Sequence, residues 1–320
     1  MNNLELPMLP LVVIVGPTAS GKSALGMALA KDLCAEIIAC DSTQLYRGVD
    51  VGTAKPTADE LREIPHHLID VLDPSEVATA GGYRDLALAA LTDLRKRQRL
   101  PILTVGTGLY MRALLEGLAD LPLRSEEVRA RLRESARKRG AAHLHGVLRR
   151  MDREAAAKIA PTDEQKLIRA IEVCVLTRKP ISEVHRAGRH PLQGWRVLKV
   201  GLIPEREELY RRIAQRTDAM VAGGWLDEVK GLLAAGIAPD AKAFDFLGYR
   251  EMLAVLREEL TIDQARATIQ QATRNYAKRQ MTWFRKDTSI TWFSGAGDEV
   301  SIQLEIAAWI RDRLGVGGRA

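Results

Sequence analysis

The sequence contains few cysteines, and their arrangement excludes the commonest uses of that residue. Among its 320 residues there are three, Cys34, Cys40 and Cys174, and they form no C-x-x-C pair. No histidines cluster with them, so we expect neither a zinc site nor a disulfide framework. Unpaired cysteines fit a reducing cytoplasm, which is the location we expect for this chain.

Long apolar runs are also missing from the start of the chain. The first run, Leu11–Val15, follows Pro7 and Pro10 and ends at Gly16. It is too short to span a bilayer and lacks the basic residues that begin a signal peptide. We interpret it as the first strand of a buried sheet and expect no association with a membrane. The sequence has no internal repeat and no low-complexity segment.

The overall composition is that of a soluble globular protein. Apolar residues make up 46% of the chain and charged residues 28%, which are ordinary proportions. A chain of 320 residues can bury a substantial core in one large or two smaller domains. The net charge of +6 and the isoelectric point near 9.3 are compatible with a polyanionic partner but do not identify one.

One segment carries a specific chemical signal. It is Gly16-Pro17-Thr18-Ala19-Ser20-Gly21-Lys22-Ser23, which fits G-x-x-x-x-G-K-[ST] and joins an apolar run to a segment of helical character. Backbone N–H groups of such a loop point at an anion. Lys22 would add a positive charge, and Ser23 a hydroxyl ligand for Mg²⁺. The pattern favours a phosphate or diphosphate site over a plain glycine-rich turn, without identifying the phosphorylated molecule.

The first third of the chain alternates strand-like and helix-like segments. We predict strands at residues 36–40, 66–72 and 101–105 and a helix at 83–99. This alternation indicates βαβ units and a parallel sheet whose ligands bind at the carboxyl ends of the strands. The predicted fold class is therefore α/β, with a P-loop NTPase-like parallel sheet flanked by helices.

Helical spacing replaces the strands in the middle of the chain. Residues 124–150 carry nine Lys or Arg against three Glu, and strand patterns return only at 197–203 and 289–293. We interpret residues 121–194 as a helical insertion. Residues 1–120 and 195–320, which include the C-terminal helices, would then form the core.

Asp41 follows the predicted strand at 36–40. If that strand runs parallel beside the first one, the Asp41 carboxylate opens on the same edge of the sheet as Lys22. It would then serve as a Mg²⁺ ligand or a general base. The competing interpretation is a turn cap, a common use of aspartate at a strand end.

Arg216 falls on a predicted inward-facing stripe of a helix. Leu209, Ile213, Arg216 and Met220 are spaced by four, three and four residues. A guanidinium at such a position requires an anion, because desolvating it without a partner is costly. The anion is either an internal carboxylate or the phosphate groups of a ligand, which we favour.

Two further features allow more than one interpretation. Gly106-Thr107-Gly108 ends a predicted strand and is either a second backbone approach to the ligand or a simple tight turn. Segment 274–286 mixes five basic residues with Tyr276, Trp283 and Phe284, which suits nucleic acid as well as a solvated helix face.

Together these segments resemble the tRNA dimethylallyltransferases, nearly end to end. The most specific blocks are Asp41-Ser42-Thr43-Gln44-Leu45-Tyr46-Arg47-Gly48 and Gly52-Thr53-Ala54-Lys55-Pro56; others are Pro65-His66, Gly106–Tyr110, Gln165–Glu172, Gly248–Arg250 and Ala277–Gln280. The resemblance implies transfer of a dimethylallyl group from dimethylallyl diphosphate to the exocyclic N6 of the tRNA adenosine 3′ of the anticodon. It also implies Mg²⁺ as cofactor, and we expect a monomer.

The resemblance also assigns roles by motif position. Asp41 would be the general base, Ser23 and Lys22 would hold Mg²⁺ and diphosphate in the Gly16–Ser23 loop, and Arg216 would bind the diphosphate from the other side. The implied contacts with the tRNA anticodon stem-loop are Asp41, Ser42, Thr43, Gln44, Thr107, Arg129, Gln165, Lys166, Leu167, Ile168, Arg169, Asp245, Phe246, Leu247, Gly248, Tyr249, Arg250, Lys278 and Arg279. One departure is visible, because Val105 stands where the family usually has the first glycine of Gly-Gly-Thr.

Other functions remain open at this point. The leading alternative is a P-loop kinase of a small metabolite, which would transfer the phosphoryl group of ATP. A smaller relative that prenylates free adenine nucleotides would not need the basic insertion. A non-catalytic, nucleotide-gated RNA-binding module would bind tRNA and be indifferent to the loss of Asp41.

Overall fold

The computed structural model describes residues 8–186 and 188–315. Contacts divide the chain into two compact units. We call the first the sheet unit; it comprises the described residues up to Leu114 and those from Gln193 onward. The second, the helical unit, comprises Leu115–Leu192. No helix among the described residues combines the length and the apolar character needed to cross a membrane.

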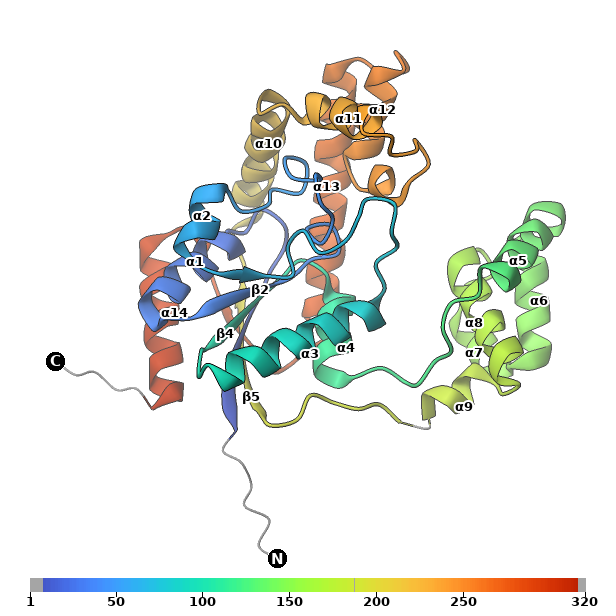
Figure 1. The fold of residues 1–320 in the computed structure, drawn as a ribbon, viewed down its shortest axis with the longest axis horizontal. Coiled ribbons are helices and arrows are strands. Elements are labelled where there is room, and N and C mark those ends of the chain that lie inside the picture. Colours follow the sequence, from blue (N-terminus) through green and yellow to red (C-terminus); the bar gives the residue numbers. More distant parts are fainter. Residues whose placement is uncertain (1–7, 187, 316–320) are drawn as a thin grey trace, which may run out of the picture. The chain divides into compact units, whose positions relative to one another are not determined.

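The sheet unit is built on six parallel strands (Figure 1). Their bounds are β1 (Leu9–Val15), β2 (Glu36–Cys40), β3 (His66–His67), β4 (Pro101–Val105), β5 (Trp195–Leu202) and β6 (Ile290–Phe293). The strand order is β3-β2-β4-β1-β5-β6. The predicted α/β fold with a parallel sheet is therefore confirmed.

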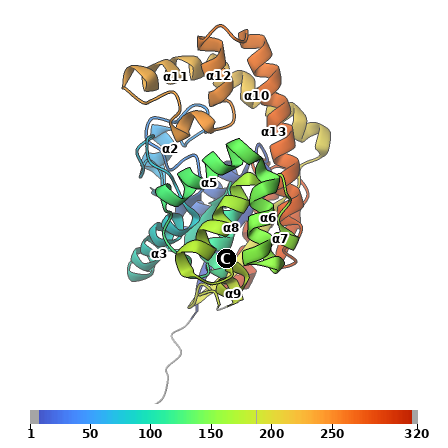
Figure 2. The same ribbon diagram turned by 90° about the vertical axis from the view of Figure 1, so that its right-hand side faces the viewer.

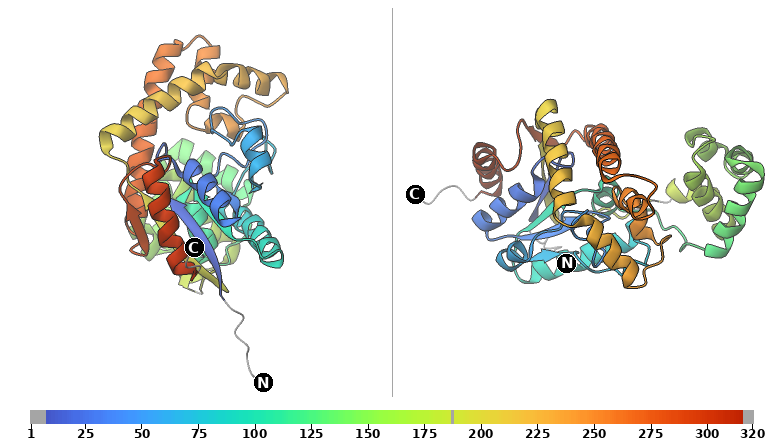
Figure 3. Two further views of the ribbon diagram at one scale, coloured as in Figure 1. Left: turned by 90° about the vertical axis from the view of Figure 1, so that its left-hand side faces the viewer. Right: turned by 90° about the horizontal axis from the view of Figure 1, so that it is seen from above.

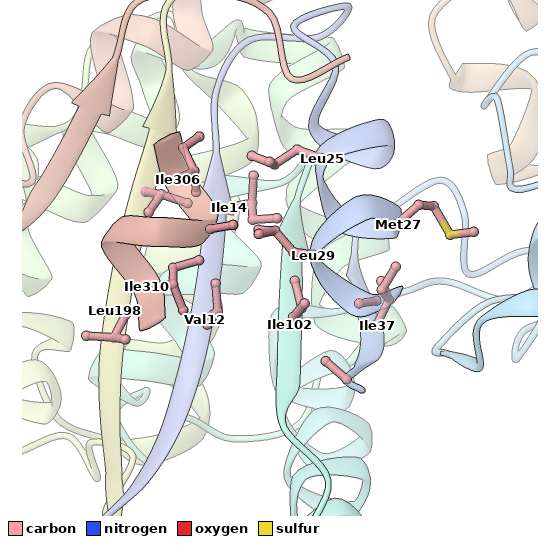
Figure 4. Packing of buried hydrophobic residues seen from close by; sticks show 14 of the residues in the cluster. Val12, Ile14, Leu25, Met27, Leu29, Ile37, Ile102, Leu198, Ile306 and Ile310 are labelled. Carbon is pink, nitrogen blue, oxygen red and sulfur yellow. The ribbon is translucent and has the colours of Figure 1, made fainter. Parts of the chain in front are cut away.

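One face of the sheet packs against α1 (Lys22–Leu33) and α14 (Val300–Leu314). Strand residues alternate between the two faces, so Val12 and Ile14 of β1 point to this side. They meet Leu25 and Leu29 of α1, with Ile306 on α14 (Figure 4). Both side chains from β1 are fully buried, so the first strand and the helix that follows the loop share one core.

The opposite face carries α3 (Ala80–Lys96) and α4 (Gly108–Glu116). Tyr83 of α3 is buried and interacts with the Cys40 thiol at the end of β2. Its ring stacks on Tyr110 of α4, with 4.5 Å between centroids. Burial raises the pKa of the Cys40 thiol well above its ordinary value, so this cysteine is an inert part of the core.

The predicted strand at 66–72 is mostly wrong. Only His66–His67 pair with β2. Leu68 and Asp70 have φ angles of 65° and 56°, and such left-handed residues cannot continue a ladder. The segment therefore turns away and forms an isolated bridge between Tyr46 and Leu72.

The remaining helices of the sheet unit gather around the carboxyl ends of the strands, and the last and longest of them runs on alongside the sheet (Figures 1 and 2). They are α2 (Ala58–Glu63), α10 (Arg206–Ala222), α11 (Trp225–Ala234), the 3₁₀ turn η1 (Lys242–Asp245), α12 (Tyr249–Leu256) and α13 (Ile262–Phe284). Helices α10 and α13 pack against each other (Figure 3). Thr261 begins α13 with a capping box in which its side chain and that of Gln264 exchange hydrogen bonds with the backbone.

The helical unit contains no strand among its described residues, as the sequence predicts. Its helices are α5 (Glu126–Arg139), α6 (Ala141–Met151), α7 (Arg153–Lys158), α8 (Glu164–Thr177) and α9 (Ile181–Arg186). Helices α6, α7 and α8 lie side by side (Figure 2). Leu144, Leu148, Leu167 and Ile171 form part of its separate apolar core.

Candidate active site

The Gly16–Ser23 loop connects β1 to α1 in a conformation that requires its glycines. Gly16 has a φ of +152° and Gly21 a φ of +83°. A Cβ on Gly16 would lie 2.8 Å from Ser20 Oγ, and one on Gly21 would lie 2.6 Å from the backbone nitrogen of Gly297. Side chains at these positions would break the loop, so its N–H groups and the start of α1 can converge on an anion.

Two cationic side chains lie at this loop, Lys22 within it and Arg216 on α10. The Lys22 ammonium donates to the carbonyl oxygens of Gly16 and Pro17 at 3.0 and 2.7 Å. Burial, with a smaller contribution from the nearby Arg216 guanidinium, lowers the pKa of Lys22 to about 7 against the opposing effect of Asp41. Burial also lowers the pKa of Arg216. Two cations whose charged forms are both disfavoured by burial favour an anion beside them.

Arg216 has no carboxylate paired with it among the described residues. The charged group that favours its ionisation is Asp41, which opposes the lowering of its pKa by burial. Of the predicted stripe on α10, Leu209 and Ile213 are buried against Ala277, whereas Arg216 opens into the cavity beside the loop. The internal ion pair considered from the sequence does not occur in the described part of the chain.

Asp41 reaches the site by a different route from the one the sequence suggests. Its strand β2 is parallel to β1 but not next to it, because β4 lies between them. Gly106 follows β4, and a Cβ there would lie 1.9 Å from Asp41 Oδ2. The absence of a side chain at Gly106 therefore lets the carboxylate lie across the end of β4.

The Asp41 carboxylate is also held from its own side. Oδ1 accepts hydrogen bonds from the Thr43 backbone N–H and hydroxyl at 2.9 and 2.8 Å. The predicted turn cap thus exists, and it uses Oδ1. No described group is recorded as donating to Oδ2, which leaves that oxygen for chemistry.

One cavity of about 640 Å³ brings these groups together. Lys22, Ser23, Asp41 and Arg216 line it with the rest of the loop from Thr18 onward. The carboxylate and the cations therefore lie within reach of a single ligand. All these residues belong to the sheet unit.

A second cavity of about 310 Å³ shares Thr18, Asp41 and Arg216 with the first. It is lined by further residues that the resemblance implies, namely Ser42, Thr43, Asp245, Phe246, Leu247 and Tyr249. Ser42 donates its N–H to Thr107 Oγ1 at 2.9 Å, which ties the loop after β2 to the loop after β4. Asp41 thus stands at the junction of a cationic cavity and a partly aromatic one.

Within the block Gly52–Pro56, residues 53–56 line the first cavity and Gly52 lines the second. Lys55 is almost fully buried and donates to Tyr46 O, Asp50 and Asp70. Gln44 Nε2 donates to the carbonyls of Thr53 and Ala54 at 3.3 and 3.2 Å. These two side chains hold the loop in shape, and Gln44 has this structural role in addition to the one implied from the sequence.

The other residues of the sheet unit that the resemblance implies as tRNA contacts differ in how exposed they are. Gly248 and Tyr249 are buried and Arg250 is exposed, with an ion pair to Asp245. Lys278 and Arg279 are exposed on α13, and Arg279 lies over the Tyr276 ring. Val105, the departure from the family pattern, is the last residue of β4 and fully buried.

In the helical unit, the implied residues are divided between surface and core. Gln165 and Lys166 are exposed, whereas Leu167 and Ile168 are buried. Arg129 and Arg169 both pair with Glu172, which is fully buried. Leu167 and Ile168 therefore present no side-chain surface to a partner, because the helix turns them into the apolar core.

Gln280 and Arg212 also belong to the site but received no role from the sequence. Gln280 bonds to the backbone of both the Thr18 and the Gly106 loops. Arg212 donates to Ala19 O at 2.9 Å and to Asp298 at 2.7 Å. Gln280 does end the family block Ala277–Gln280, and it lies four residues from Tyr276; for Arg212 the available signal was its spacing of four residues from Arg216.

The fold and these cavities define an α/β P-loop protein whose anion site faces a carboxylate. The IPP transferase family matches residues 44–287, and the isopentenyl transferase family matches residues 9–75. A tRNA dimethylallyltransferase of Koribacter versatilis is 50% identical over 292 residues, covering 91% of this chain and 95% of that protein. One from Solibacter usitatus is 47% identical over 295 residues, covering 92% and 96%.

Solved structures agree with these relatives. The tRNA isopentenylpyrophosphate transferase of Bacillus halodurans superposes with a TM-score of 0.70 at 39% identity, covering 96% of this chain and 97% of that one. A eukaryotic dimethylallyltransferase described as acting on tRNA has a TM-score of 0.81 at 24% identity, covering 97% and 80%, and shares the fold. The chain belongs to the IPP transferase family of tRNA dimethylallyltransferases.

Proposed function

We propose that this protein transfers the dimethylallyl group of dimethylallyl diphosphate to the exocyclic N6 of the adenosine 3′ of the anticodon in tRNA. The single observation that carries the proposal is the placement of Asp41 opposite two cations in one cavity of a chain from this family. A base and a diphosphate site on either side of one reacting carbon are what this transfer requires.

The diphosphate is the group that the cations stabilise. As the C–O bond of the donor breaks, negative charge grows on the leaving diphosphate. The loop N–H groups, Lys22 and Arg216 stabilise this charge more in the transition state than in the ground state. Arg216 presents a planar fork of donors to phosphate oxygens, from the side opposite the loop.

Asp41 takes the proton from the amine. An adenine amine is a weak nucleophile, so a carboxylate that accepts its proton as the new C–N bond forms lowers the barrier. Oδ2 is the oxygen for this step, because Oδ1 already accepts two hydrogen bonds from Thr43. Atoms balance: N6 loses one proton to Asp41 and gains the dimethylallyl group, and diphosphate leaves.

Mg²⁺ is part of the proposal. The ion prefers oxygen ligands and keeps several waters, binding through one or two protein groups plus phosphates. Ser23 is exposed at the start of α1 and lines the cavity, so its hydroxyl fits as a protein ligand beside the diphosphate. Bound there, Mg²⁺ would neutralise part of the diphosphate charge.

The tRNA would reach Asp41 through the second cavity. The target base must leave its stack before its amine can meet the donor, and the cavity lined by Asp41, Phe246 and Tyr249 offers aromatic walls. The exposed cations Lys166, Lys278, Arg279 and Arg250 would contact backbone phosphates of the anticodon stem-loop, with salt-sensitive affinity.

The test is a transfer assay on an anticodon stem-loop. Incubation with protein, Mg²⁺ and dimethylallyl diphosphate should add the mass of one dimethylallyl group, located on the adenosine 3′ of the anticodon by fragmentation. The same stem-loop with inosine at that position lacks the amine and should gain nothing. Phosphoryl transfer from ATP to a small metabolite, with no use of the prenyl donor, would contradict the proposal and identify a kinase.

A further inference from the structure

Gln280 lies on α13 between two loops of the active site. Its side chain is only 6% exposed. Its Oε1 accepts a hydrogen bond from the Thr18 N–H at 2.8 Å, and its Nε2 donates to the Gly106 carbonyl oxygen at 2.8 Å. One buried amide therefore joins the diphosphate loop to the loop that follows β4.

The bond to Gly106 bears directly on Asp41. The Gly106 carbonyl also accepts from the Tyr276 hydroxyl at 3.0 Å, so two donors from α13 hold this peptide. The α-carbon of Gly106 lies against Asp41, with Oδ2 1.9 Å from where a Cβ would be. A shift of the Gly106 backbone would therefore displace the oxygen that we assign as the base.

The bond to Thr18 bears on the diphosphate site. Because the Thr18 N–H already donates to Gln280, it is not available to a phosphate. The cradle is left to the N–H groups nearer the start of α1. The hydrogen bond also sets how far the first half of the loop lies from β4.

Glutamine suits this position chemically. The bridge needs an acceptor facing an N–H and a donor facing a carbonyl, and a carboxamide is the side-chain group that supplies both without charge. A buried donor or acceptor left without its partner is costly. The two loops therefore keep their separation as long as the amide is present.

We infer that Gln280 is a positioning residue that fixes the distance between the diphosphate loop and the Asp41 carboxylate. Its predicted effect on turnover rests on the function proposed above, whereas the bridge itself does not. A misplacement of about 1 Å between reacting groups can cost about a hundredfold in rate. Gln280 lies 262 residues from Thr18 and 174 residues from Gly106 in the chain, so only the fold brings these residues together.

The first test is Gln280→Met, which keeps the size of the side chain and removes both hydrogen bonds. We expect kcat to fall about ten- to a hundredfold while the KM values for donor and stem-loop stay within about threefold. Gln271→Met is the matched control, since Gln271 is exposed on the same helix. A kcat within about twofold of the wild type, or a loss confined to KM, would overturn the inference.

The second variant, Gln280→Glu, guards against a simple folding defect. Its carboxylate can accept from Thr18 but places an oxygen against the Gly106 carbonyl. Once protonated, it supplies a donor again and reproduces the amide. The ratio of its kcat to that of the wild type should therefore rise as the pH falls, and a ratio independent of pH would count against the bridge.

A measurement without turnover separates this inference from the proposed function. In Gln280→Met the Thr18 amide loses its acceptor, so its hydrogen exchange should become faster, while Gln271→Met leaves it unchanged. Unchanged exchange in Gln280→Met would refute the bridge even if the wild type is fully active. Faster exchange in a protein that transfers no dimethylallyl group would support the bridge and reject the proposed function.

Discussion

The two units of the molecule treat buried charge in opposite ways. In the helical unit, the fully buried Glu172 accepts from Arg129 at 2.9 Å, from Arg169 at 2.6 Å and from the Ser125 N–H at 2.8 Å. In the sheet unit, Lys22 and Arg216 face a cavity with no carboxylate paired to either among the described residues. Glu172 is thus neutralised within the protein, whereas Lys22 and Arg216 are the cations to which we assign the diphosphate.

This difference indicates which of the two units carries the candidate active site. A paired buried charge stabilises the fold only as long as both partners remain. Two buried cations without a carboxylate partner cost stability, and under the proposed function they are retained because they bind the diphosphate. Five predictions test this contrast.

The largest expected effect is that of Asp41→Ala. It should lower kcat about a thousandfold, because the general base is lost, while stem-loop affinity stays within a few-fold. Single-turnover rates and stem-loop binding should be measured separately. Asp59→Asn, on an exposed carboxylate of α2, is the control. Loss of binding in place of rate would mean that Asp41 positions RNA and takes no proton.

The next largest effect is on stability and belongs to the helical unit. Glu172→Gln should lower the free energy of unfolding by about 3–5 kcal/mol, because two guanidinium groups lose their carboxylate. Donor KM should not change. Denaturant unfolding would measure the loss, with the exposed Glu164→Gln of the same helix as control. If Glu172→Gln lowers the free energy of unfolding no more than Glu164→Gln does, the contrast drawn between the two units is wrong.

This stabilisation should also depend on pH. Burial raises the pKa of Glu172 and is the largest influence, but hydrogen bonds from Arg129, Arg169 and Ser125 together outweigh it and lower the pKa below its ordinary 4.5. A lowered carboxyl pKa stabilises the folded state above the ordinary value, and the contribution is lost as pH falls below it. The difference between the wild type and Glu172→Gln should therefore shrink in acid.

Arg216→Ala should show the opposite pattern to Glu172→Gln. We expect kcat/KM for the donor to fall about a hundredfold with no loss of thermal stability, since the guanidinium binds diphosphate and no internal carboxylate. Arg211→Ala, an exposed residue of the same helix paired with Glu208, is the control. A large fall in melting temperature with unchanged donor dependence would identify a structural ion pair.

The smallest effect is the pH dependence of anion binding at Lys22. With a pKa near 7, Lys22 is charged below that pH and neutral above it, and the anion binds the charged form. Affinity for inorganic diphosphate should fall by up to about tenfold per pH unit above 7, relative to Lys22→Arg, whose charge is constant. Calorimetry on both proteins cancels the ionisation of the ligand. An affinity ratio that does not vary with pH would contradict the prediction.

Much of the fold could be predicted from local pattern. Five of the six predicted strands form at or near the predicted residues, and β2 and β4 have the predicted bounds, Glu36–Cys40 and Pro101–Val105. The loop Gly16–Ser23 is visible because its spacing is local, as are the blocks around Asp41 that the family shares. The prediction for 66–72 failed because the backbone of Leu68 and Asp70 turns left-handed, which apolar content does not reveal.

The sequence by itself determined the parallel α/β class, the position of the glycine-rich loop Gly16–Ser23 and the family, since each depends on residues close together in the chain. Only the tertiary structure decided that β4 separates Asp41 from β1, that Gly106 lets the carboxylate cross it, and that Gln280 bridges both loops. It also decided that Glu172 is paired, whereas Arg216 has no carboxylate partner in the part of the chain that the structure describes. Strand order and side-chain packing set these distances between remote residues, and a local pattern of residue types does not contain them.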